Sequence, residues 1–507
     1  GVSSAASDVY KRQILAHKLI EDGISHGDKV ILFMENRPSY VSTILALNKI
    51  GAIGVLINTS LKGEPLIHCI NSSNSKKCIF GAELSGSLEG VLSSINITAK
   101  SSIYWVQDLP YANCPEWATD INKILDLSKT DNLSETNNVT AKDIAFYIFT
   151  SGTTGVPKAA LFPNVKIVAS STNITRGGYR MNSEDCLYNC LPLYHSTGMM
   201  LGLCACIHVG ASTFIKRKFS ASSFWKEVKK YNTTAFIYVG ELCRYLSLQD
   251  PVDEEKDNPI TKMVGNGLRP DLWDCFRNRF CVERICEIYG ASEGNGFFMN
   301  LLNKDQTIGM TNNKIELLEY DIGENKLKKD IDGNFIRVKE NQPGLALVEI
   351  GPNAIFNGYT DKKASDEKIF RNVFNDGDSW FNTGDILKTM DVGFALGRKH
   401  YQFVDRVGDT FRWKSENVST NEVAEILNLF NQVNMANVYG VKIPKSEGRA
   451  GMVAFNCELK EFKWSDFSKF VAEKLPKYAQ PIFIRIIKEL ETTGTFKLKK
   501  NVLRVEA

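Results

Sequence analysis

The stretch YIFTSGTTGVPKAA, residues 147–160, carries the most information about the fold. Its apolar start predicts a buried strand, and the strand runs into a loop of small and hydroxyl residues: Thr150, Ser151, Gly152, Thr153, Thr154 and Gly155. Backbone N–H groups and hydroxyls in such a loop can converge on an anion, and Lys158 adds a cation beside them. The stretch therefore predicts a polyphosphate-binding loop, with a polar surface loop as the alternative. It is not a Walker loop, because the GxxxxGK[ST] spacing is absent.

Strands and helices alternate on both sides of this loop. Before it, apolar runs predict strands at 29–34, 52–57, 77–80 and 103–106, with helical spacing at 38–50 between the first two. This alternation is typical of a parallel, doubly wound α/β sheet. The pattern continues from residue 143 to about residue 403.

Beyond Arg406 the elements become shorter. We expect a hairpin-like segment at 403–413, a helix capped by Ser419 and Glu422, strands near Val438 and Val453, and a helix ending before Pro476. The predicted domains are a large one at 14–404 and a small one at 405–507. Residues 1–13, GVSSAASDVYKRQ, share no pattern with the rest and are interpreted as a non-native adaptor.

Composition excludes several classes of protein. The 507 residues are 43% hydrophobic and 23% charged, which is typical of a folded globular chain. With 61 basic and 58 acidic side chains the net charge is +3, so nucleic acid is not an expected partner. The 12 cysteines form no CxxC pair, which argues against a zinc site or a disulfide framework.

The most apolar stretch, residues 199–215, is interrupted by Gly202, His208 and Gly210. It predicts a buried helix and a core strand instead of a membrane span. The basic run Lys216, Arg217 and Lys218 follows it, and is either a solvated strand end or a surface that touches a bilayer.

Five motifs in a fixed order resemble those of the adenylate-forming enzymes. They are the loop at 147–160, VGELCRYL at 239–246, GNGLRPDLW at 265–273, IYGASEGN at 288–295 and VDRVGDTFRWKSENVST at 404–420. The last four are similar to the branch of fatty-acid transport proteins, or very-long-chain acyl-CoA synthetases. The resemblance extends from about residue 14 to the end and implies a fragment that lacks the family's N-terminal membrane segment. It also implies a distorted β-barrel in the large domain and a small, mobile α+β C-terminal domain.

The resemblance implies a reaction in two steps, with ATP, Mg²⁺ and CoA as co-substrates. A fatty carboxylate attacks the α-phosphate of ATP and releases pyrophosphate, and the CoA thiol then displaces AMP from the acyl-adenylate. Residues 150–155 and Lys158 would stabilise the charge on the leaving pyrophosphate. Glu293 would bind the metal, with the hydroxyl of Thr153 or Thr154 nearby.

Further nucleotide-binding residues follow from the other motifs. Tyr289 offers an aromatic face for adenine, with core packing as the alternative, and Asp385 of WFNTGDIL matches the residue that binds the ribose. Arg406 would reach the ribose or the α-phosphate, unless it only pairs with Asp405. The remaining nucleotide positions that the resemblance implies are Gly265, Gly267 and Ser292.

Two candidate catalytic residues depend on the resemblance alone. Lys497 of TTGTFKLKK would act on the acyl-phosphate, and His195 of LPLYHSTG would lie between the acyl pocket and the phosphates. In the family the small domain rotates between the half-reactions, and Gly408 occupies the hinge region. Ser415 stands where the branch has glycine, near the pantetheine channel, so the thioester step is in doubt.

The sequence thus predicts an AMP-forming ligase of long-chain or very-long-chain fatty acids. The family resemblance implies membrane association with the active site facing the cytosol, at the endoplasmic reticulum, peroxisome or plasma membrane. Two alternatives stay open, namely an acyl-AMP-forming enzyme with another acceptor and a non-catalytic lipid-uptake protein. The intact Lys158, Glu293, Asp385, Arg406 and Lys497 argue against a degenerate site.

Overall fold

The computed structural model describes residues 5–107, 112–151, 157–290, 295–322, 326–352, 354–356, 362–413, 416–444, 448–488, 490 and 500–507. The chain divides into two units, each described by itself. Unit one comprises residues 1–237, 252–263 and 357–365. Unit two comprises residues 238–251, 264–356 and 366–507.

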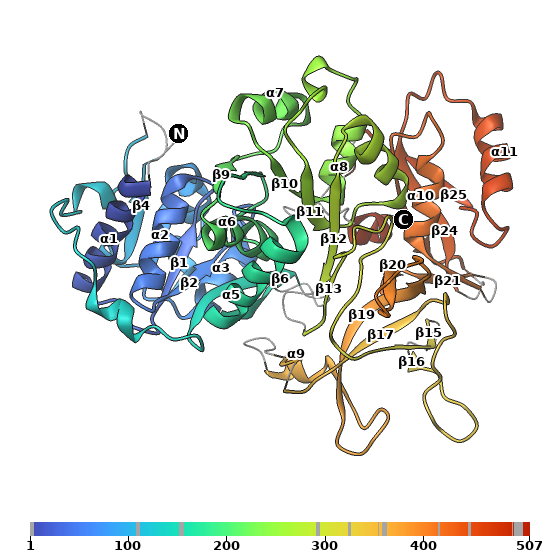
Figure 1. Cartoon of the computed structure of the whole chain (residues 1–507), viewed down its shortest axis with the longest axis horizontal. Coiled ribbons are helices and arrows are strands. Elements are labelled where there is room, and N and C mark those ends of the chain that lie inside the picture. Colours follow the sequence, from blue (N-terminus) through green and yellow to red (C-terminus); the bar gives the residue numbers. More distant parts are fainter. Residues whose placement is uncertain are drawn as a thin grey trace. The chain divides into compact units, whose positions relative to one another are not determined.

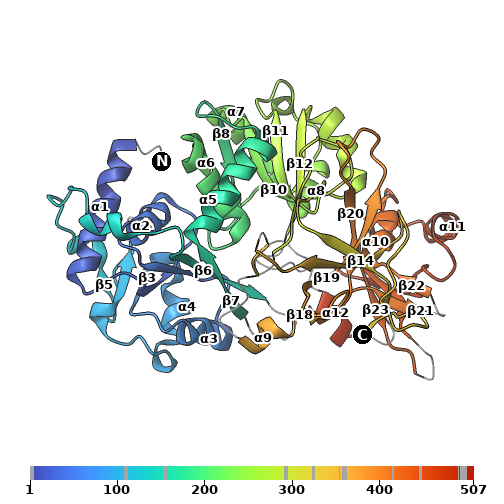
Figure 2. The same cartoon turned by 60° about the horizontal axis from the view of Figure 1, so that its bottom comes forward.

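Unit one contains a sheet of seven strands in the order β5-β4-β3-β1-β2-β6-β7 (Figures 1 and 2). The strands are β1 (Lys29–Phe33), β2 (Ile53–Leu56), β3 (Lys77–Gly81), β4 (Ile103–Val106), β5 (Thr119–Asp120), β6 (Ile144–Ser151) and β7 (Pro157–Pro163). All pairs are parallel except β6 and β7. The predicted doubly wound sheet is confirmed, and the predicted phosphate loop is the stretch of sequence between the antiparallel strands β6 and β7.

Helices cover both faces of this sheet, as Figure 2 shows. Helices α1 (Ala5–Glu21) and α2 (Pro38–Lys49) pack on the side chains of Val30 and Leu32, whereas α3 (Gly63–Ser73) and α4 (Ser85–Glu89) pack on those of Ile31 and Phe33. Alternate residues of one strand point to opposite faces, so a continuous apolar strand such as β1 has to be buried on both sides. Helix α1 includes residues 5–13, which the sequence pattern had set aside.

A second group of parallel strands in unit one is β8 (Cys186–Asn189), β9 (Ser212–Ile215) and β10 (Ala235–Val239), the last of which ends in unit two. A π-helical segment (Thr197–Leu203) and helix α6 (Cys204–Val209) precede β9. The remaining helices of this group are α5 (Asn164–Asn173) and α7 (Ala221–Tyr231). Residues 199–215 are thus helix and strand, as predicted, and no helix in the described ranges is long and apolar enough to cross a bilayer.

The basic run after β9 is engaged in ion pairs within unit one. Lys216 pairs with Glu227, and Glu35 lies 3.7 Å from Arg217 and 3.4 Å from Lys218. These pairs favour the solvated strand end over the bilayer contact.

The first helix of unit two is α8 (Gly240–Ser247). Strand β11 (Lys262–Asn266) belongs to unit two from Val264 onward, and strands β12 (Arg284–Gly290) and β13 (Phe297–Met299) follow. A further sheet has the order β14-β17-β19-β18, and β20 pairs with β19. Its strands are β14 (Ile315–Leu318), β17 (Gly344–Glu349), β18 (Ile369–Arg371), β19 (Ser379–Met390) and β20 (His400–Arg406). All the pairs in this sheet are antiparallel. The short hairpin β15 (Tyr320–Asp321) and β16 (Lys326–Leu327) belongs to unit two, and helix α9 (Lys362–Asp366) lies where the chain passes from unit one to unit two.

The C-terminal part of unit two has its own core. Strands β23 (Met435–Val441), β24 (Ala450–Asn456) and β25 (Phe483–Ile486) form one sheet. Helices α10 (Thr420–Asn428) and α11 (Trp464–Lys474) pack on one face through Val423 and Phe467, whereas α12 (Lys500–Val505) packs on the other through Leu503. This is the small α+β region that the sequence predicts.

The hairpin predicted at 403–413 is wrong. Strand β20 pairs with β19, and β21 (Phe411–Trp413) pairs instead with β22 (Glu416–Val418). Residues 407–410 therefore join two separate sheets and do not form a hairpin turn.

Candidate active site

The strand pair β6–β7 holds the two residue pairs at which the predicted phosphate loop starts and ends, in unit one. Lys158 on β7 lies opposite Thr150 on β6, and Pro157 lies opposite Ser151. Lys158 is half-buried. Gly152, Thr153, Thr154 and Gly155 lie outside the described residues, as do the side chains of Thr150 and Ser151. What the structure describes of the predicted loop is thus the strand pair that leads into it and its lysine.

His195 lies in unit one, just before the π-helical segment (Thr197–Leu203). The backbone N–H of Thr197 points to Nδ1 of the half-buried ring at 3.4 Å. The carbonyl of His195 accepts a 2.9 Å bond from the Met199 N–H, so the ring is attached to the first turn of the segment.

Unit two brings together three residues that the sequence analysis assigned to the nucleotide. Asp385 on β19 is directly opposite Arg406 on β20, and the guanidinium Nε is 3.5 Å from Oδ1 of the carboxylate. The Tyr289 hydroxyl on β12 donates a 2.6 Å hydrogen bond to Oδ2. One carboxylate thus links three strands, and it is 8% exposed whereas the side chain of Arg406 is 55% exposed.

The environment of Tyr289 keeps its hydroxyl protonated. Burial, and then the negative charge of Asp385, raise the pKa of Tyr289 well above its usual value. The ring packs edge-on against Phe298, with the centroids 5.3 Å apart. The side chain therefore both packs in the core and orients Asp385.

Gly384 sets the direction of Asp385. Its φ of +72° lies in the left-handed region, which glycine adopts at little cost, and its carbonyl accepts a 3.0 Å bond from the Val407 N–H. The TGD sequence is therefore more than a surface turn, because it forms an irregularity inside β19 that carries the carboxylate.

The Arg406 guanidinium pairs with Asp385 and not with the neighbouring Asp405, which was the alternative considered from the sequence. Only the backbone N–H of Arg406 donates to Asp405 Oδ1, at 2.9 Å, among the described contacts. The Asp405 side chain is 1% exposed and accepts hydrogen bonds from the Thr420 N–H at 2.6 Å, the Thr420 hydroxyl at 3.0 Å and the Asn421 amide at 3.1 Å. It therefore fastens the start of α10 to β20. Adjacent residues point to opposite faces of a strand, so Arg406 is directed toward Asp385 instead.

The glycines of GNGLRPDLW are required by close backbone approaches. A Cβ on Gly265 would lie 2.2 Å from the Tyr238 carbonyl oxygen, and Gly267 has a φ of +82°. These contacts hold the turn after β11 against the end of β10.

Sequence reasoning missed Glu287, which is buried beside this turn. Its carboxylate accepts hydrogen bonds from the Leu268 N–H at 3.1 Å, from the Gly267 N–H and from the Tyr238 hydroxyl. Burial raises the pKa of Glu287 to about 8. The available signal was an acidic residue inside the otherwise apolar strand RICEIYG.

Several predicted residues lie outside the described part of the chain. They are Ser292, Glu293, Ser415 and Lys497. Within that part, no group of three or more His, Cys, Asp and Glu side chains could hold a metal ion. A Mg²⁺ ligand set around Glu293 therefore stays a prediction.

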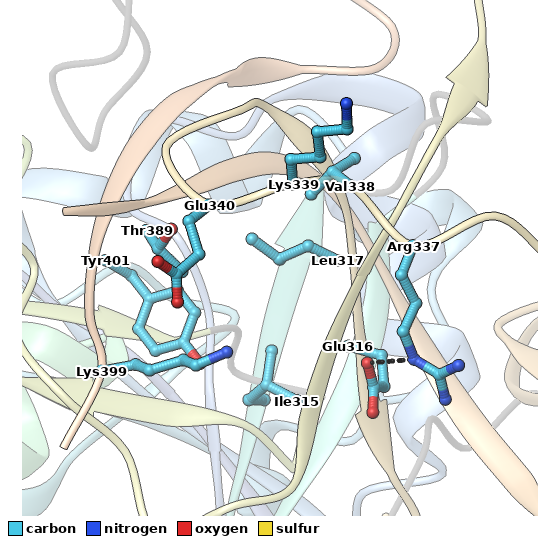
Figure 3. Close-up of a pocket in the computed structure, with 10 residues that line it drawn as sticks. All are labelled: Ile315, Glu316, Leu317, Arg337, Val338, Lys339, Glu340, Thr389, Lys399 and Tyr401. Atoms are coloured by element: carbon cyan, nitrogen blue, oxygen red, sulfur yellow. Dashed lines mark hydrogen bonds and ion pairs between the residues drawn. The ribbon is translucent and has the colours of Figure 1, made fainter. Parts of the chain in front are cut away.

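Figure 3 shows a pocket on the sheet of unit two, and none of the predicted site residues is among the residues that line it. It has a volume of about 100 Å³ and is lined by Ile315, Glu316, Leu317, Arg337, Val338, Lys339, Glu340, Thr389, Lys399 and Tyr401. Glu316 and Arg337 form an ion pair in it at 2.9 Å. Pockets for nucleotides or drug-sized ligands typically have volumes of about 300–1,000 Å³, so this one is too small for ATP.

A larger groove of about 890 Å³ lies beside β15, β16 and β18. Cationic residues line it, but Lys328 is 3.6 Å from Glu319 and Arg371 is 3.1 Å from Asp366. These ion pairs offset much of the positive charge, and none of the predicted nucleotide residues lines the groove.

Comparisons with known proteins show the family of the chain. The family model described as AMP-binding enzyme matches residues 11–333. Mouse long-chain fatty acid transport protein 6 is 39% identical over 97% of this chain and 79% of its own length. The medium/long-chain-fatty-acid–CoA ligase FadD6 of Mycobacterium tuberculosis is 38% identical over 96% of this chain and 78% of its own length.

A solved structure shares the fold at low sequence identity. ATP-bound MatB from Rhodopseudomonas palustris has a TM-score of 0.80 and 17% identity, covering 99% of this chain and 93% of that one.

Proposed function

Because the chain belongs to the family of AMP-binding enzymes, with fatty acid transport proteins and a fatty-acid–CoA ligase among its relatives, we propose that it is an AMP-forming fatty acyl-CoA ligase. The fatty carboxylate attacks the α-phosphorus of ATP, and pyrophosphate leaves with the electron pair of the broken P–O bond. The CoA thiol then attacks the acyl carbonyl, AMP leaves, and the thiol proton passes to solvent. Long-chain or very-long-chain acids are the proposed substrates.

The Asp385 cluster is the observation within the structure that supports this proposal most strongly. A carboxylate can accept hydrogen bonds from both ribose hydroxyls, and Tyr289 and Arg406 are among the groups that already contact Asp385. The Tyr289 hydroxyl is a neutral donor that leaves the carboxylate charge in place. The exposed Arg406 guanidinium fits phosphate oxygens and is proposed to bind the α-phosphate.

The remaining roles follow the family pattern. Lys158 and the loop 150–155 are proposed to stabilise the leaving pyrophosphate, and His195 to separate the acyl chain from the phosphates. Lys497 is proposed to stabilise charge on the acyl-phosphate. When bound with ATP, Mg²⁺ would neutralise phosphate charge, and Glu293 supplies the hard oxygen ligand that this ion prefers.

The first test is exchange of labelled pyrophosphate into ATP in the presence of a long-chain fatty acid. We expect fatty-acid-dependent exchange by the wild-type chain. Asp385→Asn should lower kcat/KM for ATP by about 10- to 100-fold, because hydrogen bonds to charged groups contribute roughly 1.5–3 kcal/mol. The matched control is the exposed Asp376→Asn, which should exchange like wild type.

The assay also separates the alternatives. AMP and thioester formed together support the ligase. AMP without thioester supports an acyl-adenylate enzyme with another acceptor and implicates Ser415. No exchange with medium-chain, long-chain or very-long-chain acids would contradict the proposal and favour a non-catalytic lipid-uptake protein.

Membrane association with a cytosol-facing active site is part of the proposal, since the substrates are ATP and an acid that partitions into bilayers. Flotation of the protein with anionic liposomes would test the association. Failure to float would contradict that part alone.

A further inference from the structure

Glu287 is a buried carboxylate to which the reaction assigns no role. It is 4% exposed and lies on β12, two residues before Tyr289. Its three side-chain hydrogen-bond partners within the described ranges, two backbone N–H groups and a tyrosine hydroxyl, are neutral donors. Ionising a buried acid without a cation is costly, and an apolar residue would avoid this cost, so the presence of an acid here needs an explanation.

The three donors come from two segments that precede β12 in the chain. Gly267 and Leu268 belong to the turn after β11, and Tyr238 lies at the end of β10. The turn has little room for change, because a Cβ on Gly240 would lie 1.6 Å from the Gly267 carbonyl oxygen. One carboxylate thus fixes the turn to both neighbouring strands.

The same strand then reaches the ribose-binding residue. Residues two apart in a strand lie on one face, so Glu287 and Tyr289 share a face of β12. Tyr289 donates to Asp385 at 2.6 Å. Strand β12 therefore orients both features: Glu287 contacts the Gly265–Leu268 turn, and Tyr289 contacts Asp385.

We propose that Glu287 is a positioning residue for nucleotide binding, which holds the 265–268 turn in register with Tyr289 and Asp385. It does not touch the reacting atoms. The proposal rests on the proposed function, because it assigns ATP to the face that the turn and Asp385 build.

The chemistry of the acceptor gives the test. A glutamine at position 287 keeps an oxygen for the two N–H groups, and its amide can donate to the Tyr238 oxygen. Alanine leaves the N–H groups of the turn without an acceptor. The aspartate side chain is shorter by one carbon–carbon bond, so its oxygens lie roughly 1.5 Å farther from these N–H groups.

The experiment measures KM for ATP and KM for fatty acid separately by pyrophosphate exchange. Glu287→Ala should raise KM for ATP by about tenfold or more while KM for fatty acid changes less than about twofold. Glu287→Gln should stay within about threefold of wild type for both. The control is Glu255→Ala, which removes a buried glutamate elsewhere and should leave both KM values near those of wild type.

Each result decides the proposal. If Glu287→Ala does not fold, the Asp and Gln variants are compared, and a raised KM for ATP only in Glu287→Asp supports the proposal. Equal KM values for ATP in the Gln and Asp variants, or a change confined to the fatty acid, would overturn it. A wild-type chain without any exchange would refute the proposed function first, so the two failures are distinguishable.

Discussion

Asp405 and Arg406 are neighbours in one strand, yet they act in different parts of unit two. Asp405 is buried and holds the first turn of α10, whereas Arg406 reaches Asp385 on β19. The sequence analysis named Asp385, Arg406 and Tyr289 as candidates from three separate motifs, and the structure shows that their side chains meet. The sequence alone could not assign their partners, since the register of β19 against β20 decides which side chains meet.

Glu287 gives a prediction about pH and stability. Its pKa of about 8 in the folded chain compares with about 4.3 for an exposed glutamate. Between these values the folded state keeps a proton that the unfolded state has released, so stability falls as pH rises through this window. The Glu287→Gln variant lacks this titration. Between about pH 6 and pH 8 the unfolding free energy of wild type should therefore fall by roughly 1 kcal/mol or more beyond the fall in the variant.

Urea unfolding at the two pH values, followed by tryptophan fluorescence, measures this difference. An identical pH dependence in wild type and variant would contradict a raised pKa at this position. The sequence showed an acid in an apolar strand, but only the fold shows that no cation accompanies it among the described residues.

At the scale of elements, sequence patterns predicted an interaction correctly where the two interacting residues are close in sequence. The capping pair of α10 is confirmed, because the Glu422 N–H donates to the Ser419 hydroxyl oxygen at 3.2 Å. The predicted hairpin at 403–413 failed because β20 pairs with the earlier strand β19. Spacing along the chain cannot distinguish two strands of one hairpin from strands of two sheets.

The cap gives the prediction at this scale. Ser419→Ala should destabilise α10 by about 1 kcal/mol, because the Glu422 N–H loses its side-chain acceptor. Ser419→Thr keeps the hydroxyl and serves as the control. Amide hydrogen exchange in α10 should be faster in the alanine variant alone, and equal protection in both variants would contradict the capping role.

At the scale of the whole molecule, the sequence predicted a doubly wound sheet and a small α+β region, because long apolar strands and helical spacing are strong local patterns. The limits of the structural units could not be predicted in the same way. Residues 238–251 belong to unit two although the residues on both sides of them in the sequence belong to unit one. Such an assignment depends on packing between segments that are far apart in sequence.

The connection at 407–410 joins two sheets and is held by the last helix. The Arg504 guanidinium donates to the Gly408 carbonyl at 3.1 Å and to the Asp409 carboxylate at 3.0 Å, and Lys500 lies 3.5 Å from the same carboxylate. In the described part of the chain, no atom outside the two adjacent residues lies within 4 Å of a Cβ built on Gly408. Alanine at position 408 therefore fits the conformation seen here. Glycine would be required only if the chain also adopts a second backbone conformation at this residue.

Proline at position 408 tests whether such a second conformation is used. It fixes φ near about −65° and so opposes the large backbone change that rotation of the small region between half-reactions requires. We expect Gly408→Pro to keep pyrophosphate exchange within about threefold of Gly408→Ala and to lower thioester formation by roughly tenfold or more. Rapid-quench measurement of AMP and acyl-CoA in both variants checks this. If the proline variant forms acyl-CoA as fast as the alanine variant, the two half-reactions need no rotation at this connection, because a chain locked in one backbone conformation would then complete both.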